Sequence, residues 1–538
     1  YRMENMQNYW QFSVKDSTGN YKALAKLKPR TGDGKWRNGD LGITLKYNPD
    51  PNAGLDPSAF NPYDAGKSVY YYYNAALSPE RVRIHGSDSH SSQFTATPFD
   101  DVIYTGNGEL HHVMGAGGND YIVGGNGREI IYAGTGNRGV VQNDDDTAFG
   151  GGNSDIITGG DGNDTLYADD GSNSYENPLP NESALTESEK RGDWISGQHG
   201  SDTIIGSAKK DVLAGGAGDD TIRAGAGDDL VLGDANYVPS SMFNNLSYSQ
   251  QTFEKRWFAD GTTRNFYDAA ITVPSHIAFE WTWSHDDKDF SVKPGKGARM
   301  MATDRVQGMG NDTLHGGAGN DWMAGQAGND EMHGDDGDDT MFGDDTVAMP
   351  AGLASGDDQL YAGKGKDKLH GGAGNDLLDA SDDDNDKDEL SGDEGDDQLN
   401  GGTGGDELNG GAGNDVLRAG KDKTLMDGGI DNDIYFGNSG DDTMTDQDGD
   451  DHYYLSPGMD DIKDFGMGHD GYHISFTHLM PSGVTTIHDS NGKGFITYNG
   501  RAITNDGVRA VAENEWVTDT GAKLARDGSN LVITNGPK

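Results

Sequence analysis

Aspartate residues recur every nine positions along most of this chain. The period is plainest at residues 215–232, which read GGAGDDTIR and then AGAGDDLVL, and it returns in 307–342, 353–379 and 392–454. A carboxylate repeated at a fixed interval suits a hard cation such as Ca²⁺, which takes roughly six to eight oxygen ligands from carboxylates and backbone carbonyls. Cation binding is therefore the chemistry that these residues indicate.

The other positions of the nine-residue unit determine how the carboxylates are held. Glycines at positions one, two and four permit the positive-φ backbone of a tight turn. Positions seven to nine form a short strand whose middle residue points inward and is nearly always aliphatic. The expected inward residues are Ile122, Leu166, Ile204, Leu213, Ile222, Val231, Leu314, Met323, Leu369, Leu378, Leu399, Leu408 and Leu417.

Two such units complete one coil, because each contributes one turn and one strand. Successive coils stack their strands in parallel on two faces, and the turns line both edges, with carboxylates of neighbouring turns about 4.8 Å apart. Such a row of carboxylates repels itself unless a cation lies in each gap between turns. The sequence therefore predicts an all-β fold, a parallel β-roll or nonapeptide β-solenoid, that needs multiple Ca²⁺ ions.

The composition agrees with a fold held by cations rather than by a large apolar core. Only 33% of the 538 residues are hydrophobic, and 90 acidic residues against 41 basic ones give a formal net charge of −49. Without a cation, these values are those of a disordered, solvated chain, which is the alternative interpretation. Nucleic acid and anionic membrane surfaces are poor partners for so acidic a protein.

Other classes of protein are excluded by what the sequence lacks. There is no cysteine, and hence no disulfide, thiolate metal site or cysteine nucleophile. No apolar run of about 18 residues predicts a membrane-spanning segment, and the start at Tyr1 shows no signal peptide. Because the chain does not begin with Met, we expect a processed chain or a fragment of a longer protein.

The repeat closely resembles the G-G-x-G-x-D-x-U-x nonapeptide of the RTX (repeats-in-toxin, haemolysin-type) family, over most of residues 96–454. The resemblance implies a right-handed parallel β-roll with rows of Ca²⁺ ions, in proteins exported by type I secretion machinery. By matching of position six, it also implies a set of aspartate ligands. They are Asp120, Asp155, Asp164, Asp202, Asp211, Asp220, Asp229, Asp312, Asp321, Asp330, Asp339, Asp358, Asp367, Asp376, Asp397, Asp406, Asp415, Asp433, Asp442 and Asp451.

Some units depart from this pattern. Glu129 replaces the aspartate of its unit, and Leu110 and Thr424 fall where an aspartate is expected, so we expect weakened or absent sites there. Residues 461–470 (DIKDFGMGHD) are similar to the D-x-I-x-D-F-x-x-G-x-D capping segment of the family. Residues 471–538 resemble its C-terminal flank, where an uncleaved secretion signal usually resides.

The repeats and their interruptions predict the domain organisation. The expected regions are a small β-rich N-terminal domain (1–95), β-roll (96–234, with a loop insertion at 169–191), an aromatic-rich inserted module (235–304), β-roll (305–454), and a C-terminal cap with the secretion signal (455–538). Strands are expected at 11–14, 41–47, 69–73 and, by strict alternation, 277–283. The inserted module either packs on the roll or forms a binding platform.

The segment 380–391 (ASDDDNDKDELS) breaks the nine-residue frame and gathers carboxylates. Asp382, Asp384 and Asp386 alternate as in an EF-hand loop, but Lys387 stands where that loop needs Gly. A separate calcium site and a solvated acidic loop both remain open for this segment.

No catalytic motif accompanies the repeats. HExxH and GxSxG are absent, and GSDSH at 86–90 does not define a catalytic triad by spacing alone. The pair His111-His112 is expected to be solvent-facing or in a turn rather than a metal site. We therefore expect no enzyme.

Among the remaining functions, we favour a secreted structural, adhesive, surface-layer or extracellular matrix protein that folds on extracellular Ca²⁺. The alternative is the C-terminal, calcium-binding part of a larger toxin or secreted enzyme. Expected partners are calcium ions, type I secretion machinery, other copies of the chain, and cell-surface glycans or proteins. The expected location is extracellular or at the cell surface.

Overall fold

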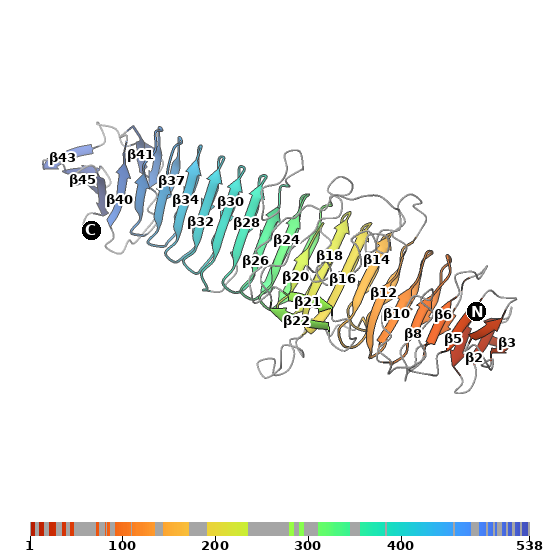
Figure 1. Cartoon of the computed structure of the whole chain (residues 1–538). Coiled ribbons are helices and arrows are strands. Elements are labelled where there is room, and N and C mark those ends of the chain that lie inside the picture. The colour runs from red at the N-terminus through yellow and green to blue at the C-terminus, as the bar shows by residue number, and fades with distance from the viewer. Residues whose placement is uncertain are drawn as a thin grey trace. The chain divides into compact units, whose positions relative to one another are not determined.

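Parallel β-strands stacked coil upon coil make up most of the computed structural model (Figure 1). It describes residues 83–86, 92–108, 110–134, 144–171, 191–234, 310–344, 356–381, 385–455, 458–474, 484–490 and 493–498, together with the strands named below that lie outside these ranges. Strands are the only regular elements longer than a turn in these parts of the chain, and accordingly no helix there is long and apolar enough to cross a membrane. The chain divides into two compact units, residues 1–318 and 319–538.

In the first unit the nonapeptide strands form two parallel ladders, which we call sheet I and sheet II. Sheet I contains β7 (Arg83–His85), β9 (Val102–Tyr104), β11 (Tyr121–Val123), β13 (Thr147–Phe149), β15 (Thr165–Tyr167), β17 (Thr203–Ile205), β19 (Thr221–Ala226) and β23 (Thr313–Ala318). Sheet II contains β6 (Tyr71–Asn74), β8 (Ser92–Thr95), β10 (Leu110–Met114), β12 (Arg128–Tyr132), β14 (Ile156–Asp161), β16 (Arg191–His199), β18 (Lys210–Ala217) and β20 (Leu230–Leu232). The chain alternates between the sheets, as two nonapeptides per coil require.

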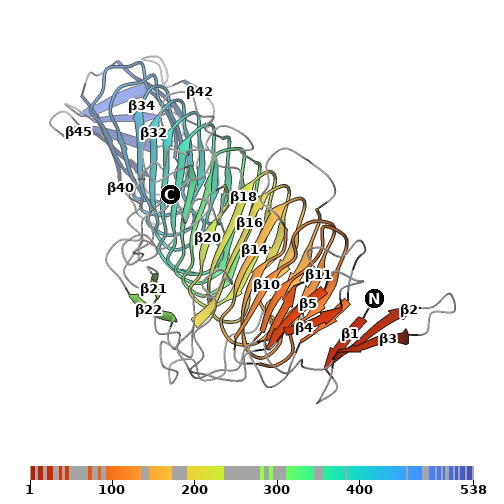
Figure 2. The same ribbon diagram turned by 45° about the vertical axis from the view of Figure 1, so that its right-hand side comes forward.

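The second unit repeats this arrangement. Its sheet I contains β25 (Glu331–Asp336), β27 (Gln359–Tyr361), β29 (Leu377–Asp379), β31 (Gln398–Asn400), β33 (Val416–Arg418), β35 (Ile434–Phe436), β37 (His452–Leu455), β39 (Gly471–Ile474) and β41 (Phe495–Tyr498). Its sheet II contains β24 (Trp322–Gln326), β26 (Thr340–Asp344), β28 (Lys368–Ala373), β30 (Glu389–Glu394), β32 (Glu407–Ala412), β34 (Leu425–Ile430), β36 (Thr443–Asp446), β38 (Asp461–Asp464) and β40 (Val484–Asp489). The turned view shows these coils obliquely, each stacked on the next (Figure 2).

The core consists mainly of side chains from position eight of each unit. Every residue expected to point inward is buried, with at most 2% of its surface exposed. Their alignment follows from the register, which places Leu378 beside Leu399 and Leu399 beside Leu417 on successive strands. The predicted parallel β-roll is therefore confirmed.

The roll extends beyond the predicted boundaries at both ends. Strands β7 and β8, before residue 96, pair in parallel with β9 and β10, and they bury Ile84 and Phe94. After residue 454, β38 to β41 continue the two ladders. The boundaries at 95 and 454 are therefore wrong, because inward apolar residues continue the coils where the glycine pattern has faded.

Antiparallel strands flank the roll. The N-terminal strands are β1 (Arg2–Asn5), β2 (Trp10–Lys15), β3 (Tyr21–Leu27), β4 (Lys35–Asn38) and β5 (Ile43–Tyr47), and the C-terminal strands are β42 (Arg501–Ala502), β43 (Val508–Ala512), β44 (Glu515–Thr518), β45 (Ala522–Asp527) and β46 (Asn530–Asn535). In the inserted module, β21 (Phe279–Trp283) and β22 (Phe290–Pro294) form an antiparallel pair where alternation predicts a strand. Its other residues lie outside the described ranges.

Candidate metal centre in the turns of the roll

The predicted ligands lie in two rows, one along each edge of a unit. All of them are buried, with at most 2% of each residue exposed. The first edge, where turns lead into sheet I, carries Asp120, Asp164, Asp202, Asp220 and Asp312 in the first unit and Asp330, Asp358, Asp376, Asp397, Asp415, Asp433 and Asp451 in the second. The second edge, where turns lead into sheet II, carries Asp155, Asp211 and Asp229 in the first unit and Asp321, Asp339, Asp367, Asp406 and Asp442 in the second.

Within each row, one oxygen of most carboxylates is held by the neighbouring coil. The backbone N–H of Asp164 donates to Oδ1 of Asp202 at 2.7 Å, and that of Asp202 donates to Oδ1 of Asp220 at 2.7 Å. In the second unit, the N–H of Asp397 donates to Oδ1 of Asp415 at 2.8 Å. These bonds fix the orientation of each carboxylate, so the row is preorganised before any ligand arrives.

The second oxygen of the carboxylates is left for a ligand. Oδ2 of Asp164, Asp202, Asp339, Asp397 and Asp415 is buried and has no hydrogen-bond partner among the described residues. A buried carboxylate oxygen without a donor is strongly unfavourable unless a cation satisfies it. The side-chain atoms of the rows that could coordinate a metal are almost entirely carboxylate oxygens. Ca²⁺ prefers this type of ligand, so the residues fit this ion.

Glycine suits these turns for two separate reasons. Gly216 and Gly218, at positions two and four of their unit, have φ of 120° and 121°, as the turn prediction requires. Gly215, at position one, is not in the positive-φ region; instead a Cβ there would overlap Oδ2 of Asp220. The prediction of positive φ at position one is therefore wrong, and the first glycine makes room for the carboxylate.

Burial and repulsion between neighbouring carboxylates raise the pKa values of aspartates in the rows. Burial, with the nearby charges of Asp202 and Asp146, raises the pKa of Asp164 to about 10. In the second unit, burial and the charge of Asp321 raise the pKa of Asp339 to about 10. Without a bound cation, these carboxylates therefore favour the protonated state at neutral pH.

The units that depart from the pattern still place a residue in the row. Glu129 occupies its position, since its N–H donates to Oδ1 of Asp155 at 2.6 Å and its Oε1 accepts from the Thr105 hydroxyl at 3.2 Å. The N–H of Thr424 donates to Oδ1 of Asp442 at 2.9 Å, so the row continues there without a carboxylate. The position without an aspartate was predicted at Leu110, but it lies one residue later. The register places His111, not Leu110, beside Glu129.

His111 also corrects the prediction for the histidine pair. Both His111 and His112 belong to strand β10, and His111 is fully buried, with its ring centroid 5.9 Å from that of Phe94. A solvent-facing or turn position is therefore wrong for His111. Of the GSDSH cluster, only Gly86 lies within the described residues.

Several aspartates of the rows were missed by matching the repeat. Asp101, Asp146, Asp193, Asp388 and Asp460 each accept a backbone N–H from the preceding coil or donate one to the next. Their units lack the usual pair of glycines before the aspartate. A sequence signal was present in the second half of the unit, since DTAFG (146–150), DWISG (193–197) and DELSG (388–392) all keep aspartate, an apolar residue two places on, and glycine.

Asp388 changes the interpretation of the acidic segment 380–391. The N–H of Asp367 donates to Oδ1 of Asp388 at 2.8 Å, and Asp388 is buried at 1% exposure. The end of this segment is therefore a coil of the roll rather than a loop. Asp386 is exposed, whereas Asp382 and Asp384 lie outside the described residues, so the EF-hand-like site stays a prediction.

Comparison with known proteins identifies the repeat. The RTX calcium-binding nonapeptide repeat (4 copies) matches residues 112–139, 142–175, 192–213, 205–236, 307–341, 354–386, 391–422 and 427–462. A search among curated proteins gives no significant match. RTX nonapeptide repeats bind Ca²⁺, and the matched segments contain most of the buried aspartate rows, which are consistent with calcium sites. The resemblance to the RTX repeat is therefore confirmed, since RTX calcium-binding nonapeptide repeats recur across residues 112–462.

Proposed function

We propose that this protein is exported by a type I secretion pathway and acts outside the cell as a non-enzymatic structural or adhesive component of the surface or matrix. The observation that supports this role is the extent of the carboxylate rows, which run through most of the described coils of both units. A chain in which the calcium-binding roll makes up most of the described residues suits a protein whose function depends on the roll itself.

Calcium linkage supports folding after export. A ligand that binds only the folded chain stabilises it by RT ln(1 + [L]/Kd) at each site, which is about 1.4 kcal/mol at tenfold Kd. Extracellular calcium modules bind at about 10⁻⁴ to 10⁻³ M, well above cytosolic calcium. Inside the cell, the net charge of −49 keeps the chain expanded and suited to threading through an exporter, and outside the cell many modest sites fold it together.

The inserted module is the segment we assign to recognition of surface glycans, surface proteins or other copies of the chain. Its sequence holds Trp257, Trp281 and Trp283 together with many other aromatic residues. Aromatic side chains are the usual anchors of binding surfaces. Attachment to a surface would thus come from one inserted element, whereas the roll sets the distance between attachment points.

Fractionation of the producing cells tests the proposal. An antibody against the whole chain should detect it on the cell surface or in the matrix, released by a calcium chelator, and absent from the outside in a matched strain without its type I exporter. Retention inside the cell in both strains would refute secretion. Recovery as part of a longer, catalytic or membrane-damaging polypeptide would favour the alternative, a calcium-binding part of a toxin or enzyme.

A further inference from the structure

Near the end of the second unit, an acidic residue replaces the glycine at position one. In most units this position is glycine, as at Gly410, where a Cβ would overlap Oδ2 of Asp415, and a few units have alanine there, as at Ala224. In the unit that begins at residue 446 the position is held by Asp446, at the end of β36, five residues before Asp451. A third carboxylate therefore enters a place that the repeat normally fills with glycine or alanine.

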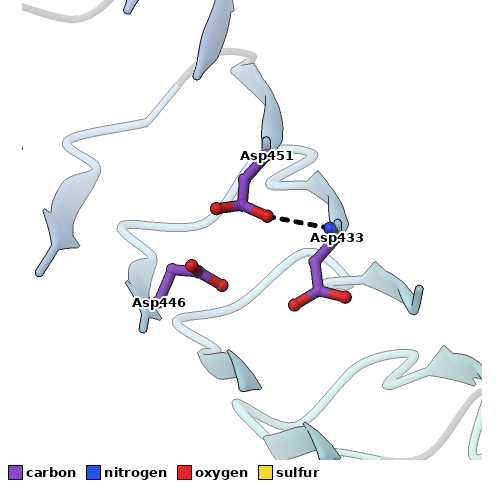
Figure 3. Close-up of side chains that lie close together, drawn as sticks. All are labelled: Asp433, Asp446 and Asp451. Carbon is purple, nitrogen blue, oxygen red and sulfur yellow. Dashed lines mark hydrogen bonds between the residues drawn. The ribbon is translucent and has the colours of Figure 1, made fainter. Parts of the chain in front are cut away.

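Asp446 joins two carboxylates of the first edge. Asp433, Asp446 and Asp451 each offer an oxygen, and these atoms all lie within 4.8 Å of one another (Figure 3). Asp433 and Asp451 are neighbours in the row, linked by the Asp433 N–H that donates to Oδ1 of Asp451 at 2.9 Å. All three residues are buried, and Oδ2 of Asp433 and of Asp446 has no hydrogen-bond partner among the described residues.

A column of tyrosines supports this arrangement from the core. Tyr435, Tyr453 and Tyr472 stand at position eight, where most other units have aliphatic residues, and their rings stack at 4.7 Å and 5.2 Å. The Tyr435 hydroxyl donates to Oδ1 of Asp446 at 2.7 Å and accepts the N–H of Gly428 at 2.6 Å. Tyr435 is thus a positioning residue. Its hydrogen bond holds Oδ1 of Asp446, so Oδ2 points away from the Tyr435 hydroxyl.

Tyr453 adds a polar group to the same place. It is fully buried, and its hydroxyl has no hydrogen-bond partner among the described residues. Its ring lies nearly parallel to that of Tyr435, with an angle of 11° between the planes, and Tyr435 is the tyrosine whose hydroxyl contacts Asp446, so the Tyr453 hydroxyl lies beside this cluster, one coil further along. An unpartnered buried hydroxyl beside unpartnered buried oxygens indicates a missing ligand.

We propose that Asp433, Asp446 and Asp451 form a three-carboxylate site for a hard cation of the Ca²⁺ class. Asp446 is a ligand outside the nonapeptide pattern, so this site differs from gaps such as that between Asp397 and Asp415, where glycine occupies position one of both units. Calcium affinity rises with the number of charged ligands, and hence the site binds more tightly than the repeat gaps. The inference holds whether the protein is an adhesin, a matrix component or part of a toxin.

Terbium luminescence tests this site in the full-length protein. Tb³⁺ replaces Ca²⁺ at oxygen sites, prefers higher ligand charge, and emits when a nearby tyrosine is excited. In the calcium-folded protein, substoichiometric Tb³⁺ should enter this site first and emit through Tyr435 and Tyr453. Asp446→Asn should raise the Tb³⁺ concentration for half-maximal emission by about tenfold. Asp450→Asn, the same change at the exposed neighbouring turn residue, should leave it unchanged.

A second variant separates ligation from folding. Asp446→Gly restores the residue that the repeat itself uses and should fold in calcium, as measured by circular dichroism, while losing the tight Tb³⁺ site. Unchanged emission in either folded variant would overturn the proposal, as would an equal loss in Asp450→Asn. If both Asp446 variants fail to fold at saturating calcium while Asp450→Asn folds, Asp446 is a structural residue and the site is rejected.

Discussion

The two oxygens of a row aspartate have different partners, and Asp397 shows the difference well. Its Oδ1 accepts the N–H of Asp376 at 2.8 Å, whereas its Oδ2 is buried without a partner among the described residues. The adjacent Asp396 is exposed and accepts the N–H of Asn414 at 2.7 Å. One residue of the turn therefore faces the cation gap, and its neighbour faces solvent.

This contrast gives a matched pair of variants. Asn in place of Asp397 keeps the Oδ1 acceptor but replaces the cation ligand by an amide donor, so we expect the calcium midpoint of folding to rise by about three- to tenfold. Asp396→Asn removes the same charge and should shift the midpoint by less than about twofold. Calcium titrations followed by circular dichroism measure both, and coinciding midpoints would contradict the assignment of Asp397 as a ligand.

Most of the row aspartates can be predicted from the sequence because the period sets both the residue type and its place in the turn. Asp146 and Asp193 escape such prediction, since insertions have removed the glycines that mark the frame. The role of His111 escapes it for another reason. Its alignment with Glu129 depends on which residues of two strands pair, and a one-residue uncertainty in register changes the assignment.

At the scale of elements, the roll tolerates long excursions between neighbouring strands. Thr221–Arg223 of β19 pair with Thr313–His315 of β23, and the N–H of Asp220 donates to Oδ1 of Asp312 at 2.7 Å, although 92 residues separate the two aspartates. This bond is as short as that between Asp202 and Asp220, which are 18 residues apart. The coil on each side of the inserted module is therefore complete without it.

Deletion of residues 236–304, with a short glycine linker in their place, tests this independence. We expect calcium-induced β-structure with a midpoint within about twofold of the parent chain, because the row and both sheets are retained. Attachment to cells or self-assembly should be lost, as measured by binding to the producing cells and by light scattering. A deletion variant that cannot fold in calcium would show that the module braces the roll, and recognition would have to be assigned elsewhere.

The strands of the repeats were predictable from the alternation of glycine turns and apolar centres, whereas the ends of the roll were not. Ile84 and Phe94 are core residues of a coil that lacks the full glycine and aspartate pattern, and β40 and β41 extend the ladders past the cap. At these ends, parallel pairing with an existing edge strand replaces the turn pattern as the organising interaction. A prediction based on the repeat alone stops where the glycines stop.

For the whole molecule, proton and calcium binding should substitute for one another. The ordinary aspartate pKa of 3.8 applies to the unfolded chain, and the folded, calcium-free value is about 10 for Asp164 and Asp339. Between these values the folded state binds more protons than the unfolded state, so the stability of the calcium-free fold falls as pH rises from about 4 to about 10. At neutral pH, the calcium-free fold has therefore already lost part of the stability that it has near pH 4.

We expect the protein stripped of calcium to lack β-structure at pH 7.5 and to regain part of it near pH 5, and calcium addition at pH 7.5 to restore all of it. The midpoint of calcium binding should rise on acidification, because protons compete for the same oxygens. Circular dichroism in calcium-free buffer across this range is the measurement. Equal spectra at the two pH values without calcium would show that the rows do not control folding, and full β-structure at pH 7.5 without calcium would do the same.

The step of 18 residues between equivalent aspartates, as from Asp397 to Asp415, also constrains how such a gene can change in length. Gain or loss of two nonapeptides adds or removes one coil and leaves every later strand in its own sheet. Gain or loss of one nonapeptide moves every later strand to the opposite sheet, and with it the column of Tyr435, Tyr453 and Tyr472 and the carboxylate of Asp446. Inherited duplications in the repeats of this protein should therefore survive mainly in pairs.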